Sequence, residues 1–227
     1  MRDLHEFLKK VNITPKHISL YEQAFTHPSY NSDANTKHHD YERLEFLGDG
    51  VIDFIIAELS FVSRPELEQG NLTKMRAALV STNGLSEIAR SLEIDKYIRL
   101  GNSFTGDIAQ ASRILEDVFE AFIGALYLDQ GFVNTKNVLV NLFINKVKTF
   151  DVESLNDYKS KLQEEVQAEH RESVSYEVIS ETGPAHDKHF VVKVSFDGIE
   201  LGRGEGSTKK AAEQLAAKAA LEKEARK

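Results

Sequence analysis

The sequence contains no cysteine, and this absence excludes several chemistries at once. Disulfide-stapled scaffolds, thiolate zinc sites and cysteine nucleophiles all need a residue that the chain lacks. Serine, histidine, carboxylate and lysine chemistry remain open. A chain without cysteine also suits a reducing compartment, so we expect a cytoplasmic protein.

Long apolar runs are missing as well. The most apolar stretch, residues 51–62, is interrupted by Asp53 and Glu58 and is much shorter than the roughly 20 apolar residues that span a bilayer. The first residues, MRDLHEFLKK, alternate charged and apolar side chains at helical spacing, unlike the continuous apolar core of a signal peptide. We expect neither a membrane helix nor secretion.

Basic residues are fewer than acidic ones. The 28 Lys and Arg against 36 Asp and Glu give a net charge of −8. Taken alone, this balance argues against a polyanionic partner, because nucleic-acid affinity comes mainly from Lys and Arg that meet phosphates. The hydrophobic content of 41% in 227 residues is ordinary for a globular chain with a buried core. Its length favours two unequal domains.

Proline is scarce in the first 150 residues, where apolar residues recur at spacings of three and four. This part is predicted to be all-helical. From about Val174 the period changes to two, and Asp197-Gly198 supplies a hairpin turn. The segment from Ser207 onward is rich in Ala, Lys and Glu, which predicts a capped helix.

The fold is therefore predicted to be mainly α. A polar stretch at residues 149–156 is the expected linker. It separates an all-helical domain, residues 1–150, from a small α-β-β-β-α domain, residues 157–225.

Four acids share one side of a predicted helix that spans residues 42–61. The steps of 3, 4 and 4 place them within an 80° wedge at 100° per residue. The rest of this helix is apolar nearly all round, so we expect it to be mostly buried. A solvated stripe is the usual fate of helical acids, but the apolar surroundings favour a functional site. The acids are Glu42, Glu45, Asp49 and Asp53.

A second helix, predicted over residues 114–129, carries Asp117 and Glu120 at i and i+3. On the same face Gly124 leaves room either for another helix or for a metal or substrate. If the two helices face each other, up to five carboxylates converge, and each pair at about 4 Å repels by roughly 4 kcal/mol at a dielectric near 20. Such a cluster needs protons or cations.

The ligand types narrow the choice of cation. Oxygen donors without Cys, and without His at a matching spacing, select magnesium or manganese over zinc. Divalent ions held by carboxylates recur in phosphodiester hydrolysis. The residues therefore point to phosphate esters as substrates.

The string ERLEFLGDGVIDFI resembles the signature helix of the ribonuclease III family, usually written ERLEFLGDAVL, and matches it completely from Glu42 to Asp49. Three further segments resemble family motifs and extend the likeness over most of residues 18–135. They are AFTHPSY, NLTKMRAALVS and ILEDVFEAFIGALYLD.

This resemblance implies a homodimeric nuclease domain that cuts double-stranded RNA, with each subunit supplying one magnesium centre in which Mn²⁺ can substitute. It implies 5′-phosphate and 3′-hydroxyl ends, and a part in rRNA and mRNA processing. By analogy Glu45, Asp49, Asp117 and Glu120 hold or orient the metal, Asp49 and Glu120 are catalytic, and Glu42 contacts substrate or supports the ligands.

The chain departs from the family pattern at a few positions. The family commonly has an acid in the turn before the M-R-A helix, where this chain has Gln69-Gly70-Asn71, and no role is assigned there. Tyr41 stands where Asn is usual. His27 lies in a family motif but is expected to be a packed or helix-capping residue.

Residues 157–225 resemble a double-stranded-RNA-binding domain over their whole length. Such domains read A-form shape through a few placed contacts, which answers the objection from net charge. Ser207 or Thr208 is expected to cap the last helix. Lys209 and Lys210 then occupy its first turn, where a cation is unfavourable unless an anion such as phosphate is present.

Two further groups of RNA contacts are expected in this domain. Gln163 and Gln167 lie one helical turn apart and can bond 2′-hydroxyls in a minor groove. His186 belongs to a G-P-x-H element that is expected to enter the next minor groove. The contacts to RNA phosphates and the contacts to the RNA grooves are thus assigned to different elements of the domain.

Two rival functions are testable on the sequence. An RNA-binding structural relative would have lost acids at the metal positions, and all four are present. A helical hydrolase of free nucleotides would not need the RNA-binding module. Both rivals are therefore weaker than a magnesium-dependent endoribonuclease.

Overall fold

The computed structural model describes residues 3–32, 38–102, 104–151, 157–170, 173–184 and 188–224. The chain divides into two compact units, Met1–Val152 and Glu153–Lys227. Each unit has an apolar core of its own.

In its described residues, the regular secondary structure of the first unit is helical, apart from an isolated parallel bridge between Thr26 and Arg99. The prediction of an all-helical first part is confirmed. Its α-helices are α1 (Leu4–Lys10), α2 (Ile18–Ala24), α3 (Glu42–Ser63), α4 (Gln69–Leu79), α5 (Thr82–Ser91) and α6 (Ser112–Lys148), and its short 3₁₀ helices are η1 (Pro28–Ser32), η2 (Ile94–Tyr97) and η3 (Ile108–Gln110).

Helix α6 is broken at Gly131, whose φ of 78° and ψ of 176° are not helical. Such a conformation is open to glycine because it lacks a Cβ. The segment before the break contains the helix predicted over residues 114–129. The segment after it runs on to Lys148 and brings Phe143 and Val147 into the core.

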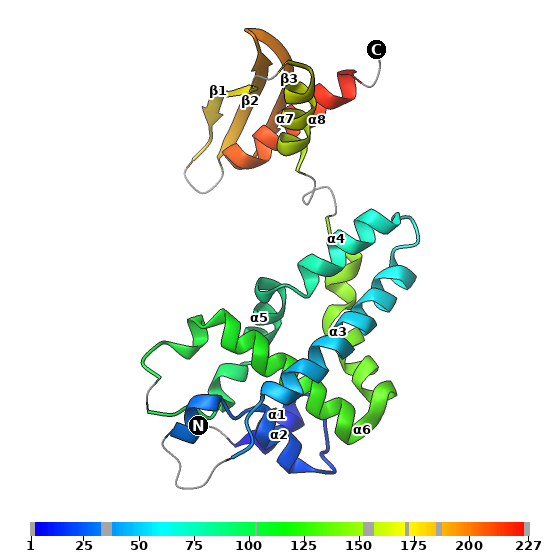
Figure 1. Ribbon diagram of the computed structural model, residues 1–227, viewed down its shortest axis with the longest axis vertical. Coiled ribbons are helices and arrows are strands. Elements are labelled where there is room, and N and C mark those ends of the chain that lie inside the picture. Colours follow the sequence, from blue (N-terminus) through cyan, green and yellow to red (C-terminus); the bar gives the residue numbers. More distant parts are fainter. Residues whose placement is uncertain are drawn as a thin grey trace. The chain divides into compact units, whose positions relative to one another are not determined.

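Helices α3 and α6 run side by side through the unit (Figure 1) and make its largest interface. Their backbones touch where two glycines meet. A Cβ on Gly48 would lie 1.8 Å from the Glu120 carbonyl oxygen, and one on Gly124 would lie 2.2 Å from the Leu44 carbonyl oxygen. Gly124 thus makes room for a helix, which decides between the two readings left open by the sequence.

One face of α3 is exposed, contrary to the expectation that the helix is mostly buried. Phe46, Phe54 and Phe61 are 84%, 61% and 70% exposed. They lie at helical spacing on one stripe, and α6 covers a different side of the helix. The expectation was wrong because apolar residues all round a helix do not show which of its faces the rest of the chain covers. Within the described residues, no helix has the length and apolar content to cross a bilayer.

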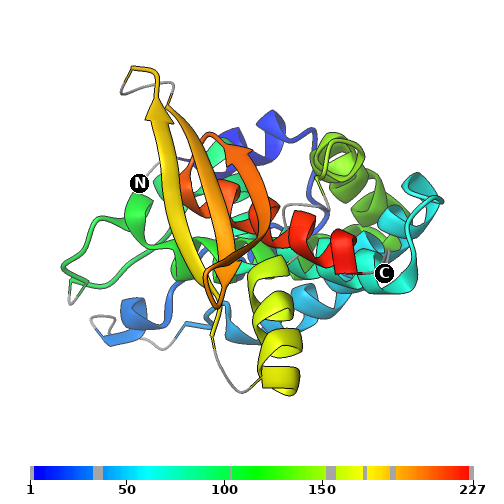
Figure 2. The ribbon, with the colours of Figure 1, turned by 90° about the horizontal axis from the view of Figure 1, so that it is seen from above.

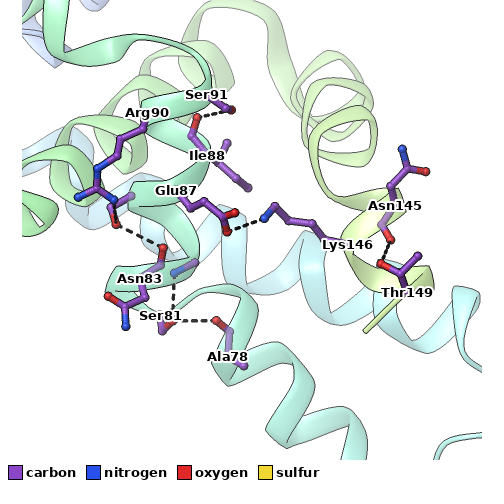
Figure 3. A network of polar contacts seen from close by, with 12 residues as sticks. Ala78, Ser81, Asn83, Glu87, Ile88, Arg90, Ser91, Asn145, Lys146 and Thr149 are labelled. Carbon is purple, nitrogen blue, oxygen red and sulfur yellow. Dashed lines mark hydrogen bonds and ion pairs between the residues drawn. The ribbon is translucent and has the colours of Figure 1, made fainter. Parts of the chain in front are cut away.

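Helix α5 ties the end of α4 to the second segment of α6 (Figure 3). The Ser81 hydroxyl accepts from the Gly84 N–H at 3.2 Å, which caps α5, and donates to the Ala78 carbonyl at 2.7 Å. The Lys146 ammonium reaches the Glu87 carboxylate at 2.7 Å. These contacts hold the second segment of α6 against the rest of the unit.

The second unit has the predicted α-β-β-β-α order. It consists of α7 (Tyr158–His170), β1 (Ser175–Thr182), β2 (His189–Phe196), β3 (Ile199–Gly206) and α8 (Lys209–Glu224). The strands form one antiparallel sheet in the order β1-β2-β3. Asp197 and Gly198, both with positive φ, make the predicted tight turn between β2 and β3.

Helix α8 lies against one face of this sheet (Figure 2). The approach is close because β3 presents glycine to it: a Cβ on Gly202 would lie 2.5 Å from the Ala216 carbonyl oxygen. Side chains that alternate with these glycines point to the opposite face. Lys193 and Arg203, which are paired in the ladder, lie on that open face.

The glycine crossing leads to a prediction about stability. Gly48→Ala should destabilise the protein by at least about 2 kcal/mol, because the new Cβ forces backbones apart. Gly50→Ala, two residues along the same helix, meets no atom within 4 Å and should stabilise by up to about 1 kcal/mol through helix propensity. Urea unfolding of both variants measures the two effects. Equal unfolding midpoints would show that the crossing tolerates a side chain.

Candidate metal centre and nucleic-acid surface

Three carboxylates converge next to the glycine crossing. Glu45 comes from α3, and Asp117 and Glu120 come from α6. Each offers one oxygen, and these oxygens all lie within 4.8 Å of one another. Glu120 is the most buried of them, with 8% of its surface exposed. The structure thus brings together three of the four residues that the sequence assigned to metal binding.

The protonation of this cluster reflects its crowding. Burial, together with the charges of Asp49, Glu116, Glu45 and Asp117, raises the pKa of Glu120 to about 8. Burial also raises the pKa of Glu45 and of Asp117. Without a cation Glu120 therefore retains its proton near neutral pH.

A divalent cation fits this donor set. It would replace the protons and relieve the repulsion between the carboxylates. Three carboxylate oxygens without nitrogen or sulfur donors are the ligands preferred by hard ions such as Mg²⁺ and Mn²⁺. The described residues thus agree with the cation type that the sequence indicates.

The remaining acids of the wedge lie around the three. Asp49 is exposed and outside the group of three, yet its charge acts on Glu120. Glu42 is exposed at the start of α3, and its charge contributes to the raised pKa of Glu45. Asp53 turns away to Arg76 of α4, with 3.4 Å between Oδ2 and the guanidinium. The full convergence of five carboxylates is thus not reached.

Glu116 is a member of this neighbourhood that the sequence reasoning missed. Its charge raises the pKa of both Glu45 and Glu120. The signal was present, since Glu116 precedes Glu120 by four residues and shares its side of the helix. Arg113 supplies the opposite charge and lowers the pKa of Glu45 and Asp117.

Two aromatic side chains border the cluster. The Tyr41 hydroxyl donates to Asp117 Oδ2 at 3.1 Å. The His27 ring meets the Tyr41 ring edge to face at 5.7 Å, and its burial lowers the pKa of the imidazole. His27 is therefore a packed residue in this fold. Tyr41 contacts the acidic cluster directly, a contact that the sequence did not predict.

In the second unit, Thr208 caps α8. Its hydroxyl accepts from the Ala211 N–H at 3.1 Å, and the helix begins at Lys209. The cap is thus the second of the two candidates, and exposed Ser207 precedes it. Lys209 and Lys210 occupy the first turn of α8 and are exposed. Lys209 also lies 3.8 Å from Glu181 and 5.7 Å from the Phe190 ring centre.

The residues proposed for groove contacts differ in their settings. Gln167 is exposed on α7. Gln163 is half-buried, and its side-chain oxygen accepts from the Val174 N–H at 3.3 Å, so it joins α7 to the start of β1. His186 lies outside the described residues.

The open face of the sheet carries basic residues that are paired within the unit. Lys193 lies 2.7 Å from Glu177, and Arg203 lies 2.6 Å from Glu200. Because a neighbouring glutamate neutralises each of these bases, this face attracts phosphate less strongly than unpaired bases would. The first turn of α8, with two adjacent exposed lysines at a helix N-terminus, is the better anion site.

Comparison with known proteins covers both units. A ribonuclease-III-like family model matches residues 17–147, and a double-stranded RNA binding motif matches residues 158–224. Ribonuclease 3 of Streptococcus gordonii is 46% identical over 92% of this chain and 91% of its own length. Ribonuclease 3 of the onion yellows phytoplasma is 40% identical over 100% of this chain and 93% of its own length.

Two solved structures of a related nuclease domain also resemble this chain. The nuclease domain of ribonuclease III from Campylobacter jejuni, in a structure at 2.2 Å, covers 66% of this chain and 100% of its own, with a TM-score of 0.59 and 31% identity. A second structure of that domain, described as showing flexibility in a region involved in dimer formation, covers 63% and 97%, with a TM-score of 0.57 and 33% identity.

The raised pKa of Glu120 predicts a pH dependence of stability. An unfolded Glu ionises near 4.5, whereas folded Glu120 holds its proton to about 8. Between these values the folded state binds more protons, so the free energy of unfolding should fall as pH rises. In EDTA the unfolding temperature should therefore decline from pH 5 to pH 8, and added Mg²⁺ should restore it most at pH 8.

Glu120→Gln should flatten this decline and weaken the response to Mg²⁺. Glu87→Gln changes an exposed glutamate of α5 in the same way and serves as the control. Thermal unfolding of the three proteins across the pH range tests this. A decline in Glu120→Gln as steep as in the wild type would contradict the assignment.

Proposed function

This chain belongs to the ribonuclease III family of endoribonucleases, and from that premise we propose that it cleaves double-stranded RNA by magnesium-dependent hydrolysis, leaving 5′-phosphate and 3′-hydroxyl ends. The observation that carries the proposal is the cluster of Glu45, Asp117 and Glu120, held in one chain with a double-stranded RNA binding motif. The cluster would bind the cation, and the motif would bind the RNA substrate.

The roles of the acids follow from their positions. Glu45, Asp117 and Glu120 would hold the ion, with Asp49 completing the set from the exposed side. Asp49 and Glu120 are the proposed catalytic residues, and Glu42, exposed at the start of α3, would contact substrate. When bound, the ion supplies Lewis-acid chemistry at the phosphoryl group. Glu120 gives up its proton on binding, because a ligating carboxylate must be ionised.

The product ends follow from which bond breaks. Water adds to phosphorus, the 3′ oxygen leaves and takes up a proton, and the phosphate stays on the 5′ side of the next nucleotide. Gln69, which stands where the family pattern commonly has an acid, is the first and exposed residue of α4. It is therefore given no part in the chemistry.

Two copies of the chain are proposed to pair through the exposed face of α3. Phe46, Phe54 and Phe61 form a stripe, and Phe132 of α6 extends it, with its ring 5.9 Å from that of Phe54. Large exposed apolar patches mark interaction sites in stable proteins. A homodimer also supplies one centre for each strand of a duplex. The family resemblance favours a second copy as the occupant.

The substrates are proposed to be double-stranded segments of rRNA and mRNA precursors. An enzyme that processes such transcripts works where they are made, which we propose to be the cytoplasm. Residues 1–150 would supply the nuclease domain and residues 157–225 the RNA-binding domain. Lys209, Lys210, Ser207, Gln163, Gln167 and His186 are the proposed contacts to RNA.

Cleavage is tested with a long RNA duplex and mapped ends. The wild type should cut in Mg²⁺ or Mn²⁺ and not in EDTA. Ca²⁺ should support binding without cutting, since its larger and looser shell lacks the required geometry. Glu120→Gln should lower the cleavage rate by more than about 100-fold. Loss of a metal ligand is expected to have a larger effect than loss of a group that only orients the ligands. Its affinity for the duplex and the activity of Glu87→Gln should stay near wild type. Normal cutting by Glu120→Gln would sink the assignment.

The lysines of α8 are tested by the salt dependence of binding. Lys209→Ala with Lys210→Ala should weaken binding equally for unrelated duplexes, and the slope of log K against log salt should shrink by about 2 if each lysine meets one phosphate. Lys193→Ala with Arg203→Ala removes the same charge from the open sheet face and should leave the slope unchanged. Identical slopes for both pairs would refute the placement of RNA on α8.

The dimer is tested by light scattering at micromolar concentration. Phe54→Asp should give a monomer, because a charge would have to be buried in the apolar interface. Ile199→Asp changes another exposed residue, 67% accessible in the second unit, and should remain a dimer. A dimeric Phe54→Asp protein would move the interface elsewhere.

A further inference from the structure

Tyr41 touches both helices that supply ligands to the acidic cluster. Its hydroxyl donates to Asp117 of α6 at 3.1 Å. Its carbonyl oxygen accepts from the backbone N–H groups of Leu44 and Glu45 at 2.9 Å each, so it also closes the first turn of α3. One residue is thus bonded to the side chain of one ligand and to the backbone of another.

We propose that Tyr41 is a positioning residue of the metal centre, whose hydroxyl holds the Asp117 carboxylate in the orientation that ligates the ion. The inference rests on the proposed function. A carboxylate bonded through one oxygen has lost free rotation about its Cβ–Cγ bond, so its other oxygen points in a fixed direction. Groups that orient ligands in this way contribute strongly to metal affinity.

The Tyr41 side chain can orient another group because it is itself immobile. Tyr41 is 4% exposed, and its backbone N–H donates to the Thr26 carbonyl at 3.1 Å. The His27 ring packs edge to face against the Tyr41 ring at 5.7 Å, an arrangement that aromatic pairs favour. The ring therefore has little room to turn.

His27 is fixed in turn by the short 3₁₀ segment that follows it. The Ser29 N–H donates to His27 Nδ1 at 3.0 Å, and the Ser29 hydroxyl lies 2.8 Å from the same nitrogen. That hydroxyl accepts from the Gly101 N–H at 3.0 Å. A chain of contacts thus runs from the loop before α6 through Ser29, His27 and Tyr41 to Asp117. It gives the AFTHPSY segment a role at the metal centre although none of its side chains is a ligand.

A second tyrosine provides a matched control. The Tyr21 hydroxyl donates to Asp129 Oδ2 at 2.9 Å, and both residues are buried. Asp129 also accepts from the backbone N–H groups of Lys16 and His17, so this bond anchors α2 and lies outside the acidic cluster. Tyr21→Phe and Tyr41→Phe each remove one buried hydroxyl from one carboxylate.

The test is Mn²⁺ binding by the full-length protein, followed by electron paramagnetic resonance. Tyr41→Phe should bind Mn²⁺ about tenfold more weakly than wild type, at the lower end of the 10–100-fold range for such groups. Tyr21→Phe should bind it as wild type does. Both variants should unfold a few degrees lower than wild type, since each loses a buried hydrogen bond.

Cleavage gives a second readout. Tyr41→Phe should need about tenfold more Mg²⁺ for half-maximal rate, while its rate at saturating Mg²⁺ changes less. The inference is overturned if Tyr41→Phe binds Mn²⁺ like wild type, or if both variants lose affinity together. Failure of the wild type to bind Mn²⁺ would instead remove the proposed function and the inference with it.

Discussion

The acidic cluster depends on how closely α3 and α6 approach each other. Helices normally lie 8–10 Å apart, with the distance set by the side chains between them. Here Gly48 and Gly124 leave no side chain at the crossing, and each glycine faces a carbonyl oxygen of the other helix. Gly48 follows Glu45 by three residues and Gly124 follows Glu120 by four. Acid and glycine therefore share a helix face, and the contact lies one turn from the cluster.

This arrangement concentrates charge at a cost to the fold. Burial and mutual repulsion raise the pKa of Glu120 to about 8, so the metal-free centre stores unfavourable energy that a cation can release. Opposing this, the Tyr41 hydroxyl and the charge of Arg113 favour the ionised form of Asp117, and Arg113 also favours that of Glu45. The apolar core of the unit has to offset the difference.

Much of this could be predicted from sequence because the signals are periodic. Helical spacing located Glu45, Asp117 and Glu120 on the faces that meet, and the period of two together with Asp197-Gly198 located the hairpin. Asp53 could not be separated from the other wedge acids, because its partner Arg76 lies on a different helix. The bond between Tyr41 and Asp117 joins residues 76 apart in the chain. No local pattern reports such a pair.

The prediction that the phenylalanines of α3 are buried failed for a different reason. A single sequence records which residues avoid water, but not whether the cover comes from the same chain or from another copy. The stripe of Phe46, Phe54 and Phe61 therefore read as core. Gln163 shows a related limit, because the sequence did not reveal that its side-chain oxygen accepts from the backbone N–H of Val174.

The net charge of −8 is compatible with an RNA partner because the basic residues are not evenly distributed or paired. Lys193 and Arg203 are paired closely with glutamates on the open sheet face, whereas Lys209 and Lys210 are adjacent and exposed at the start of α8, where Lys209 makes one longer ion pair, 3.8 Å from Glu181. An acidic cluster repels phosphate until a cation neutralises it. On the proposed function, Lys209 and Lys210 supply contacts to phosphate, and the acids of the first unit supply the ligands of the cation. The net charge of the whole chain reports neither arrangement, because each depends on a few residues placed together.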